Sequence, residues 1–268
     1  MFLGRCRGCV YNFLEMSEIG SSPRRGAKLL LRIFAGISCC NFVFAVFMAL
    51  AIGDHNPRQR AVFCMAIGLM LLWIGIGGFL SHHLRCQFRS LAQRLNLPWP
   101  LLFVIACTVL ALIEEAIATS MTNLAPAFGS NSREAFITAS TNYLDVVLGH
   151  SVIYFVPMFI AWAWLLKRYN FDSISVLLLF GFTGTLMEMS FSGPQHIAEI
   201  GLWMFVYGLM VFLPADAIPP NPREAKTPRF QHYVMAVFLP FLFMILSGPP
   251  LVLIHHLRPS TTQTLAAH

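Results

Sequence analysis

Acidic and imidazole side chains interrupt four of the chain's long apolar segments, and these residues are the first candidates for chemistry. An ionisable group at the centre of a bilayer costs roughly 2.5–3.5 kcal/mol on insertion scales, so it usually faces a cavity or a partner. The residues are Glu114 and Glu115 in segment 99–121, Asp145 and His150 in 143–167, Glu188 in 171–193, and His196 and Glu199 in 195–214.

These groups fall at a common depth if the four segments cross the membrane in alternate directions. A helix rises about 1.5 Å per residue, which puts Glu115 ~10 Å and Glu188 ~8 Å below the outer boundary. His150 falls at a similar depth, and His196 begins its segment with Glu199 one turn deeper. Four helices are therefore expected to bring polar side chains to one layer near the extracytoplasmic face.

Helical periodicity places small and polar residues on the same faces as several candidates. Small residues mark close helix contacts in membranes, so we expect these faces to point into the bundle. One face carries Thr108, Ala111, Glu115, Ala118, Thr119 and Thr122; a second carries Gly181, Gly184, Glu188 and Ser192; a third carries His196, Glu199, Trp203 and Tyr207.

Neighbouring residues on a helix point about 100° apart, so Glu114 and Glu115 cannot face one site equally well. We favour Glu115, which shares its face with the small and polar residues. Asp145 and His150 also point in different directions, and Asp145 fits a place at the membrane interface.

Four interpretations fit this set of residues. Facing helices build metal sites from carboxylates and imidazoles, which predicts a divalent-metal centre. The same groups could instead form an acid/base site that hydrolyses a lipid or peptide bond, or the proton or cation relay of a small-solute transporter. They could also pair with one another and only fix the packing of a partner-binding subunit without catalysis. The metal set is Glu115, His150, Glu188, His196 and Glu199, and the catalytic set adds Glu114.

The adjacent glutamates, Glu114 and Glu115, resemble the paired glutamates of the CPBP family of intramembrane proteases, and His150 takes the place of a family histidine. The resemblance covers these three positions. Thr119 stands where that family has an arginine, and Val146 where it has a phenylalanine, so we do not assign the chain to the family. The resemblance implies only that hydrolysis inside a membrane belongs among the interpretations.

The elements that must position these residues are membrane helices. The chain is 57% hydrophobic and 11% charged, about half the charged fraction of a soluble domain. Apolar runs of about 20 residues predict spans, so the fold class is an all-α polytopic transmembrane bundle with about seven spans. Outside the four segments named above, the spans are 27–52, 61–80 and 231–254.

Lysine and arginine residues predict the orientation. With a cytoplasmic N-terminus and seven spans, the inside segments hold 14 of these residues and the outside segments hold 4. Cytoplasmic loops carry the excess of positive charge, so we predict the N-terminus inside and the C-terminus outside. The protein is then a multi-pass protein of a plasma (inner) membrane.

One membrane domain accounts for the chain: a basic cytoplasmic segment 1–26, the helical domain 27–256 and a short tail 257–268. The net charge of +6 is explained by basic residues that flank spans, and we expect no nucleic-acid partner. The expected partner is the lipid bilayer, with a membrane-protein partner or a homo-oligomer left open. Cys6 and Cys9 form a lone CxxC motif without a second ligand pair.

Overall fold

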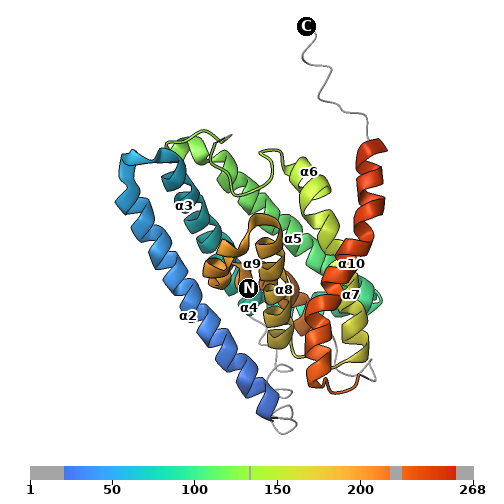
Figure 1. Cartoon of the computed structure of the whole chain (residues 1–268). Helices are drawn as coiled ribbons and strands as arrows, with labels where there is room; N and C mark the ends of the chain where they lie inside the picture. Colours follow the sequence, from blue (N-terminus) through green and yellow to red (C-terminus); the bar gives the residue numbers. More distant parts are fainter. Residues whose placement is uncertain (1–20, 133, 218–224, 258–268) are drawn as a thin grey trace, which may run out of the picture.

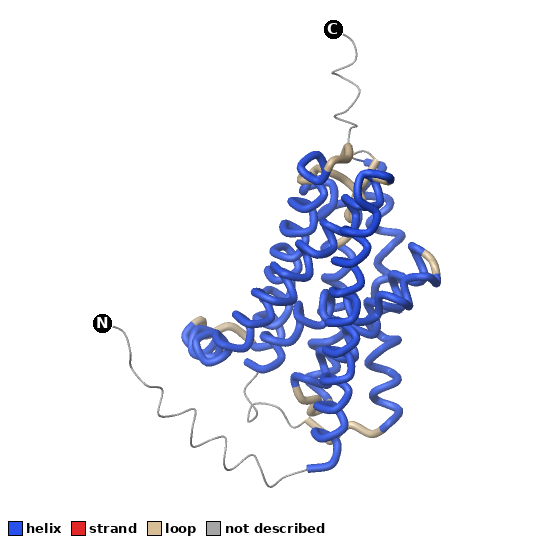
Figure 2. Tube along the Cα trace, turned by 90° about the vertical axis from the view of Figure 1, so that its left-hand side faces the viewer, coloured by secondary structure: helices blue, strands red, loops and turns tan. Residues whose placement is uncertain are grey.

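The structure is a computed structural model that describes residues 21–132, 134–217 and 225–257. All regular elements in these residues are helices, and only an isolated bridge joins Tyr169 to Lys226 (Figure 2). The Cys6 and Cys9 pair and most of both predicted terminal segments lie outside the described residues.

The helices follow the predicted spans closely. Figure 1 shows α2 along the left-hand edge of the bundle and α10 along the right-hand edge, with α5, α7, α8 and α9 between them. In chain order the long helices are α2 (Ser21–Ile52), α3 (Pro57–Leu69), α4 (Gly78–Arg94), α5 (Trp99–Asn123), α7 (Val152–Arg168), α8 (Ser173–Ser192), α9 (Ile200–Ala217) and α10 (Phe230–Leu257).

Shorter helical pieces connect them. The π-helical segment η2 (Met70–Gly77) joins α3 to α4 without a break, and η1 (Gly53–His55) precedes α3. The others are η3 (Ala125–Phe128), α6 (Tyr143–Asp145), the π turn η4 (Val146–His150) and η5 (Pro194–Glu199).

Among the described residues, six helices are long and apolar enough to cross a membrane, or seven if a bent pair counts as one span. The pair consists of Tyr143–His150 and Val152–Arg168, which meet at 47°. The length and apolar composition of these helices confirm the prediction of an all-α polytopic bundle with about seven spans. The second span differs most from its prediction, because its helix continues past residue 80 to Arg94.

Proline, asparagine and aspartate residues set where the helices begin. Asn56 caps α3 by accepting a hydrogen bond from the Gln59 backbone N–H, and Pro57 takes the first helical position. Asp172 caps α8, with its carboxylate accepting from the backbone N–H groups of residues 174 and 175. Between α8 and η5, Gly193 has φ +111, a left-handed conformation that glycine adopts without a steric penalty.

Helices α8 and α9 form a close antiparallel hairpin. A Cβ atom on Gly181 would overlap the backbone of Met204, and one on Gly184 would overlap the ring of Tyr207. Further along, a Cβ on Gly208 would press on Leu177. The absence of side chains at these positions lets the two backbones approach, as in other membrane helix pairs.

Polar contacts place the ends of several helices at the same end of the bundle. Arg89 near the end of α4 donates to the Asp216 carbonyl at 2.8 Å and to its carboxylate at 3.1 Å. Ser173 at the start of α8 also donates to Asp216, at 3.3 Å. Between α4 and α8 the chain contains only α5 and the bent pair, so both must run the length of the bundle. The bent pair therefore connects the two ends of the bundle, which is the course expected of a fourth span among seven.

Candidate functional site

Three glutamates from two helices gather inside the bundle. Glu114 and Glu115 on α5 are only 5% and 8% exposed, and Glu188 on α8 is partly buried. Their carboxyl groups are close enough to interact electrostatically: Glu188 acts on both α5 glutamates, and Glu115 acts on Glu114. We call Glu114, Glu115 and Glu188 the carboxyl cluster.

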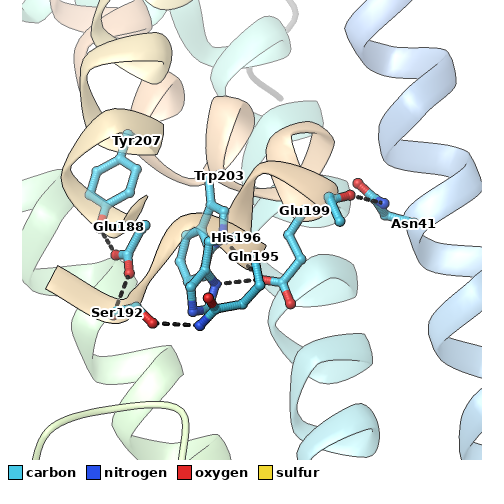
Figure 3. Close-up of polar contacts among 9 residues, drawn as sticks. Asn41, Glu188, Ser192, Gln195, His196, Glu199, Trp203 and Tyr207 are labelled. Carbon is cyan, nitrogen blue, oxygen red and sulfur yellow. Dashed lines mark hydrogen bonds and ion pairs between the residues drawn. The ribbon is translucent and has the colours of Figure 1, made fainter. Parts of the chain in front are cut away.

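Hydroxyl groups surround this carboxyl cluster. Tyr207 on α9 donates a hydrogen bond to one carboxylate oxygen of Glu188, and Ser192 donates to the other at 3.4 Å (Figure 3). The Ser151 side chain, at the bend before α7, lies close to Glu115, and its hydroxyl donates to the Val146 carbonyl at 3.2 Å. Four elements of the fold thus contribute to one polar site.

A second group of polar residues lies on η5 and the start of α9. The Nδ1 atom of His196 is 2.8 Å from the Glu199 carboxylate, and the Trp203 indole N–H donates to the same oxygen at 3.0 Å. Figure 3 shows these side chains between the Glu188–Tyr207 pair and Asn41 of α2. The side chain of Glu199 is 48% exposed, so this group lies nearer the surface than the carboxyl cluster.

Aromatic rings connect the two groups. The ring centroids of His196 and Trp203 are 5.9 Å apart, and those of Trp203 and Tyr207 are 6.1 Å apart. The shared face predicted for His196, Glu199, Trp203 and Tyr207 is therefore present in the structure. The faces predicted for Glu115 and Glu188 also turn inward, since Ala111, Thr122, Gly181 and Gly184 are buried.

The preference for Glu115 over Glu114 does not match the burial of the two side chains. Helix α5 packs against α7, α9 and α3, so more than one of its faces is covered. Both glutamates are consequently buried, and both interact with Glu188. Sequence periodicity alone could not reveal that α5 has neighbours on opposite sides.

His150 and Asp145 stay outside the carboxyl cluster. Both side chains are exposed, and within the described residues neither forms a hydrogen bond or an ion pair. The helix changes to a π turn at Val146–His150 and breaks at Ser151, whose backbone has φ −131 and ψ −80. This bend places Ser151 close to Glu115. Ser151 is not among the candidates predicted from the sequence, and the Gly149–Ser151 run of helix-weakening residues is the only signal for it.

The predicted metal set is not assembled. Among the residues that the structure describes, no group of three or more His, Cys, Asp or Glu side chains could hold a metal ion. Glu115 and Glu188 belong to the carboxyl cluster, His196 and Glu199 pair with each other, and His150 is exposed.

No basic side chain among the described residues forms an ion pair with the carboxyl cluster. Across the described ranges, the ion pairs join Arg89 to Asp216 and His196 to Glu199, and none involves Glu114, Glu115 or Glu188. The neighbours that interact with these carboxyl groups are hydroxyls and other carboxyls. Within the described part of the chain, the site is therefore acidic and has no paired cationic side chain.

A cavity of about 260 Å³ lies between α4, α5 and α9 toward the other end of α5. Its lining includes Phe103 and Ala106 on α5 and Pro214 on α9. Phe103 precedes Glu114 by about three helical turns, and Pro214 follows Tyr207 by about two turns, so each pair shares a helix face. The same α5–α9 interface thus holds a cavity at one end and the carboxyl cluster at the other.

Comparison with models of protein families, with curated proteins and with solved structures gave no match to this chain.

Proposed function

We propose that this multi-pass membrane protein carries an intramembrane acid/base site, the carboxyl cluster, which holds and transfers protons. One observation carries the proposal: three carboxyl groups lie near enough inside the bundle to interact electrostatically, and no basic side chain among the described residues pairs with them. In the orientation that the Lys and Arg count predicts, the carboxyl cluster lies toward the extracytoplasmic side of the membrane.

Electrostatic repulsion governs how these carboxyl groups ionise. Like charges in a low-dielectric interior repel strongly, so neighbouring carboxyl groups do not all ionise and share protons instead. Such groups titrate as a unit and exchange protons with a substrate or with water. In this cluster Tyr207 orients Glu188 through its hydroxyl, and Ser151 approaches Glu115.

Hydrolysis of a lipid or peptide bond is the first use for such a site. A positioned carboxylate takes the proton from an attacking water, and a neighbouring carboxylic acid or tyrosine gives one to the leaving group. Glu188 is placed to act as the base, because its two carboxylate oxygens accept hydrogen bonds from Tyr207 and Ser192. Glu114 or Glu115, each buried beside other carboxyl groups, is placed to act as the acid.

Infrared spectroscopy of the purified protein in lipid nanodiscs tests the proposal. A protonated carboxyl group has a carbonyl stretch separate from that of a carboxylate, and we expect this band at neutral pH. The substitutions Glu115→Gln and Glu188→Gln should weaken or shift the band. Glu134→Gln, at an exposed loop residue, is the matched control and should leave it unchanged. A spectrum with no such band at neutral pH would refute a proton-sharing cluster.

Proton-coupled transport of a small solute is a second candidate function, favoured by the cavity between α4, α5 and α9. Transport needs access to a central site from both membrane faces. The cavity lies toward the end of the bundle opposite the carboxyl cluster, along the same helix interface. A rearrangement of α9 against α5 would expose the carboxyl cluster to it.

Proteoliposomes that contain a pH-sensitive dye distinguish the two uses. If the protein moves protons across the bilayer, an imposed membrane potential should acidify or alkalinise the lumen, and Glu115→Gln should abolish the change. Empty liposomes and the Glu134→Gln variant are the controls. No proton flux above empty liposomes, together with a carboxyl band in the infrared spectrum, would favour hydrolysis over proton movement.

A further inference from the structure

Thr119 is a buried residue whose side-chain hydroxyl has no partner among the described residues. It is 3% exposed and follows Glu115 by one helical turn on the same face of α5. Other hydroxyls on this helix bond to the carbonyl four residues earlier: Thr108 to Val104 at 2.8 Å and Ser120 to Ala116 at 2.6 Å. Thr119 does not make this bond, so its hydroxyl is free to bind a group outside its own helix.

A file of hydroxyl groups leads from Thr119 toward the loop that follows α5. Thr122, one turn after Thr119, is fully buried, and its hydroxyl lies 3.0 Å from that of Thr138. Thr138 donates in turn to the Ser140 carbonyl at 2.9 Å. Both loop residues are partly exposed, so this file of Thr119, Thr122 and Thr138 reaches the surface.

The donor and acceptor roles along this file follow from the chemistry of the hydroxyl group. Thr138 uses its hydrogen on Ser140, so Thr122 must donate to Thr138. The backbone N–H of Ile137 donates to the same Thr122 oxygen at 3.2 Å. Thr122 is therefore satisfied by the loop, whereas Thr119 and the carboxyl group of Glu115 keep hydrogen-bonding capacity to spare.

Thr119 and Glu115 lie four residues apart, as Ser192 and Glu188 do, but Thr119 makes no direct hydrogen bond to Glu115 whereas Ser192 donates to Glu188 at 3.4 Å. Side chains at this spacing have Cβ atoms about 5–6 Å apart, so one bridging water can connect the unpartnered Thr119 hydroxyl to Glu115. A buried water needs two to four polar partners, roughly the number that Thr119, Glu115 and their neighbours can offer.

We propose that Thr119 and Glu115 bind a buried water molecule, and that this water connects the hydroxyl file to the carboxyl cluster as its route of proton entry from the outer surface. The water site stands on the geometry around Thr119. The role in proton entry rests on the proposed function of the carboxyl cluster. The proton route enters at the end of α5 opposite the cavity between α4, α5 and α9, so the route and the cavity are separate.

Hydrogen–deuterium exchange followed by infrared spectroscopy tests the route. On transfer of the protein in nanodiscs from H₂O to D₂O, the carboxyl band shifts at the rate at which deuterons reach the cluster. We expect Thr119→Val to slow this shift at least tenfold, because the methyl group cannot bind the water. Thr119→Ser keeps the hydroxyl and should exchange at the rate of the unsubstituted protein. An unchanged rate in Thr119→Val would overturn the route.

Two further variants keep this test decisive. Thr138→Val interrupts the file at its outer end without changing a membrane helix. It should also slow the shift of the carboxyl band. This variant keeps the test available if Thr119→Val fails to fold. Thr108→Val removes a hydroxyl that bonds within its own helix, and should have no effect. Slowing by Thr108→Val equal to that by Thr119→Val would mean that the effect is general to α5 and would overturn the assignment.

The O–D stretch of internal water separates failure of this inference from failure of the proposed function. A buried water gives a band apart from bulk solvent, and Thr119→Val should remove it while Thr108→Val retains it. A lost water band in a protein without any carboxyl band would support the water site and refute the proton-sharing cluster. A carboxyl band with no water band sensitive to Thr119 would refute the water site and leave the cluster standing.

Discussion

Tyr207 is the residue that joins the two polar groups of the site. Its hydroxyl donates to Glu188, and its ring packs against Trp203 on one side and Phe155 on the other, at centroid distances of 6.1 and 5.7 Å. Phenylalanine would preserve the ring contacts and remove only the hydrogen bond. The substitution therefore isolates the contribution of the hydroxyl.

We expect Tyr207→Phe to lower the free energy of unfolding by about 1–3 kcal/mol, since a buried carboxyl loses its donor. Thermal unfolding in nanodiscs measures this, and a chain of this size loses about 2–4 °C of Tm per kcal/mol. Tyr143→Phe is the control, because that hydroxyl donates to the Leu112 carbonyl at 3.0 Å in a less buried place. A larger loss for Tyr143→Phe than for Tyr207→Phe would contradict the central position given to Tyr207.

Glu114 should reduce the stability of the bundle that contains it. Its carboxyl group lies in the interior beside two others, and functional groups in such places generally cost stability. Glu114→Gln keeps the shape and removes the like-charge repulsion, so we expect Tm to rise by a few degrees, equivalent to about 1 kcal/mol. Glu134→Gln on the exposed loop should leave Tm unchanged. A fall in Tm for Glu114→Gln would indicate that the carboxyl group is held by stabilising hydrogen bonds.

At the scale of helices, the α8–α9 hairpin determines where Glu188 and Tyr207 meet. Replacing Gly184 by alanine would put a methyl group into the Tyr207 ring. Overpacking of this kind typically costs 1–3 kcal/mol, and here it would also move Tyr207 away from Glu188. We expect Gly184→Ala to lower Tm and to shift the carboxyl infrared band.

Gly36→Ala is the matched control for that prediction. Gly36 lies within α2, and a Cβ atom there would have no neighbour within 4 Å. Alanine is the better helix former, so this substitution should leave stability unchanged or raise it by about 0.5–1 kcal/mol. Equal losses at both positions would mean that close approach of α8 and α9 does not explain the effect.

The sequence allowed accurate prediction of those parts of the site that follow regular helical periodicity. The sequence predicts the inward faces of α8 and α9, because small residues at helical spacing carry a local signal. It does not predict the position of His150, since a π turn changes the direction of every side chain that follows it. The burial of Glu114 depends on which helices flank α5, and that information is not local.

At the scale of the whole molecule, the bent pair α6–α7 decides the topology. With seven crossings the inside segments hold 14 Lys and Arg residues and the outside segments 4, whereas a re-entrant pair would change these numbers to 10 and 8. The contact between Arg89 and Asp216 also requires that the pair run from end to end, because α4 and α9 must end on the same side. The charge count and the contact agree on seven crossings.

This topology predicts that the two termini lie on opposite sides of the membrane. A C-terminal fusion to alkaline phosphatase, which is active only outside the cytoplasm, should be active, and the same fusion to green fluorescent protein should be dark. N-terminal green fluorescent protein should fluoresce. Cysteine labelling supplies the internal check: a cysteine replacing Ser140 should react with an impermeant maleimide from outside, whereas one replacing Lys226 should not. If both termini fell on one side, the bent pair would be re-entrant. The carboxyl cluster would then no longer be bounded by helices that all cross the bilayer, and its proton route from the outer surface would lose its structural basis.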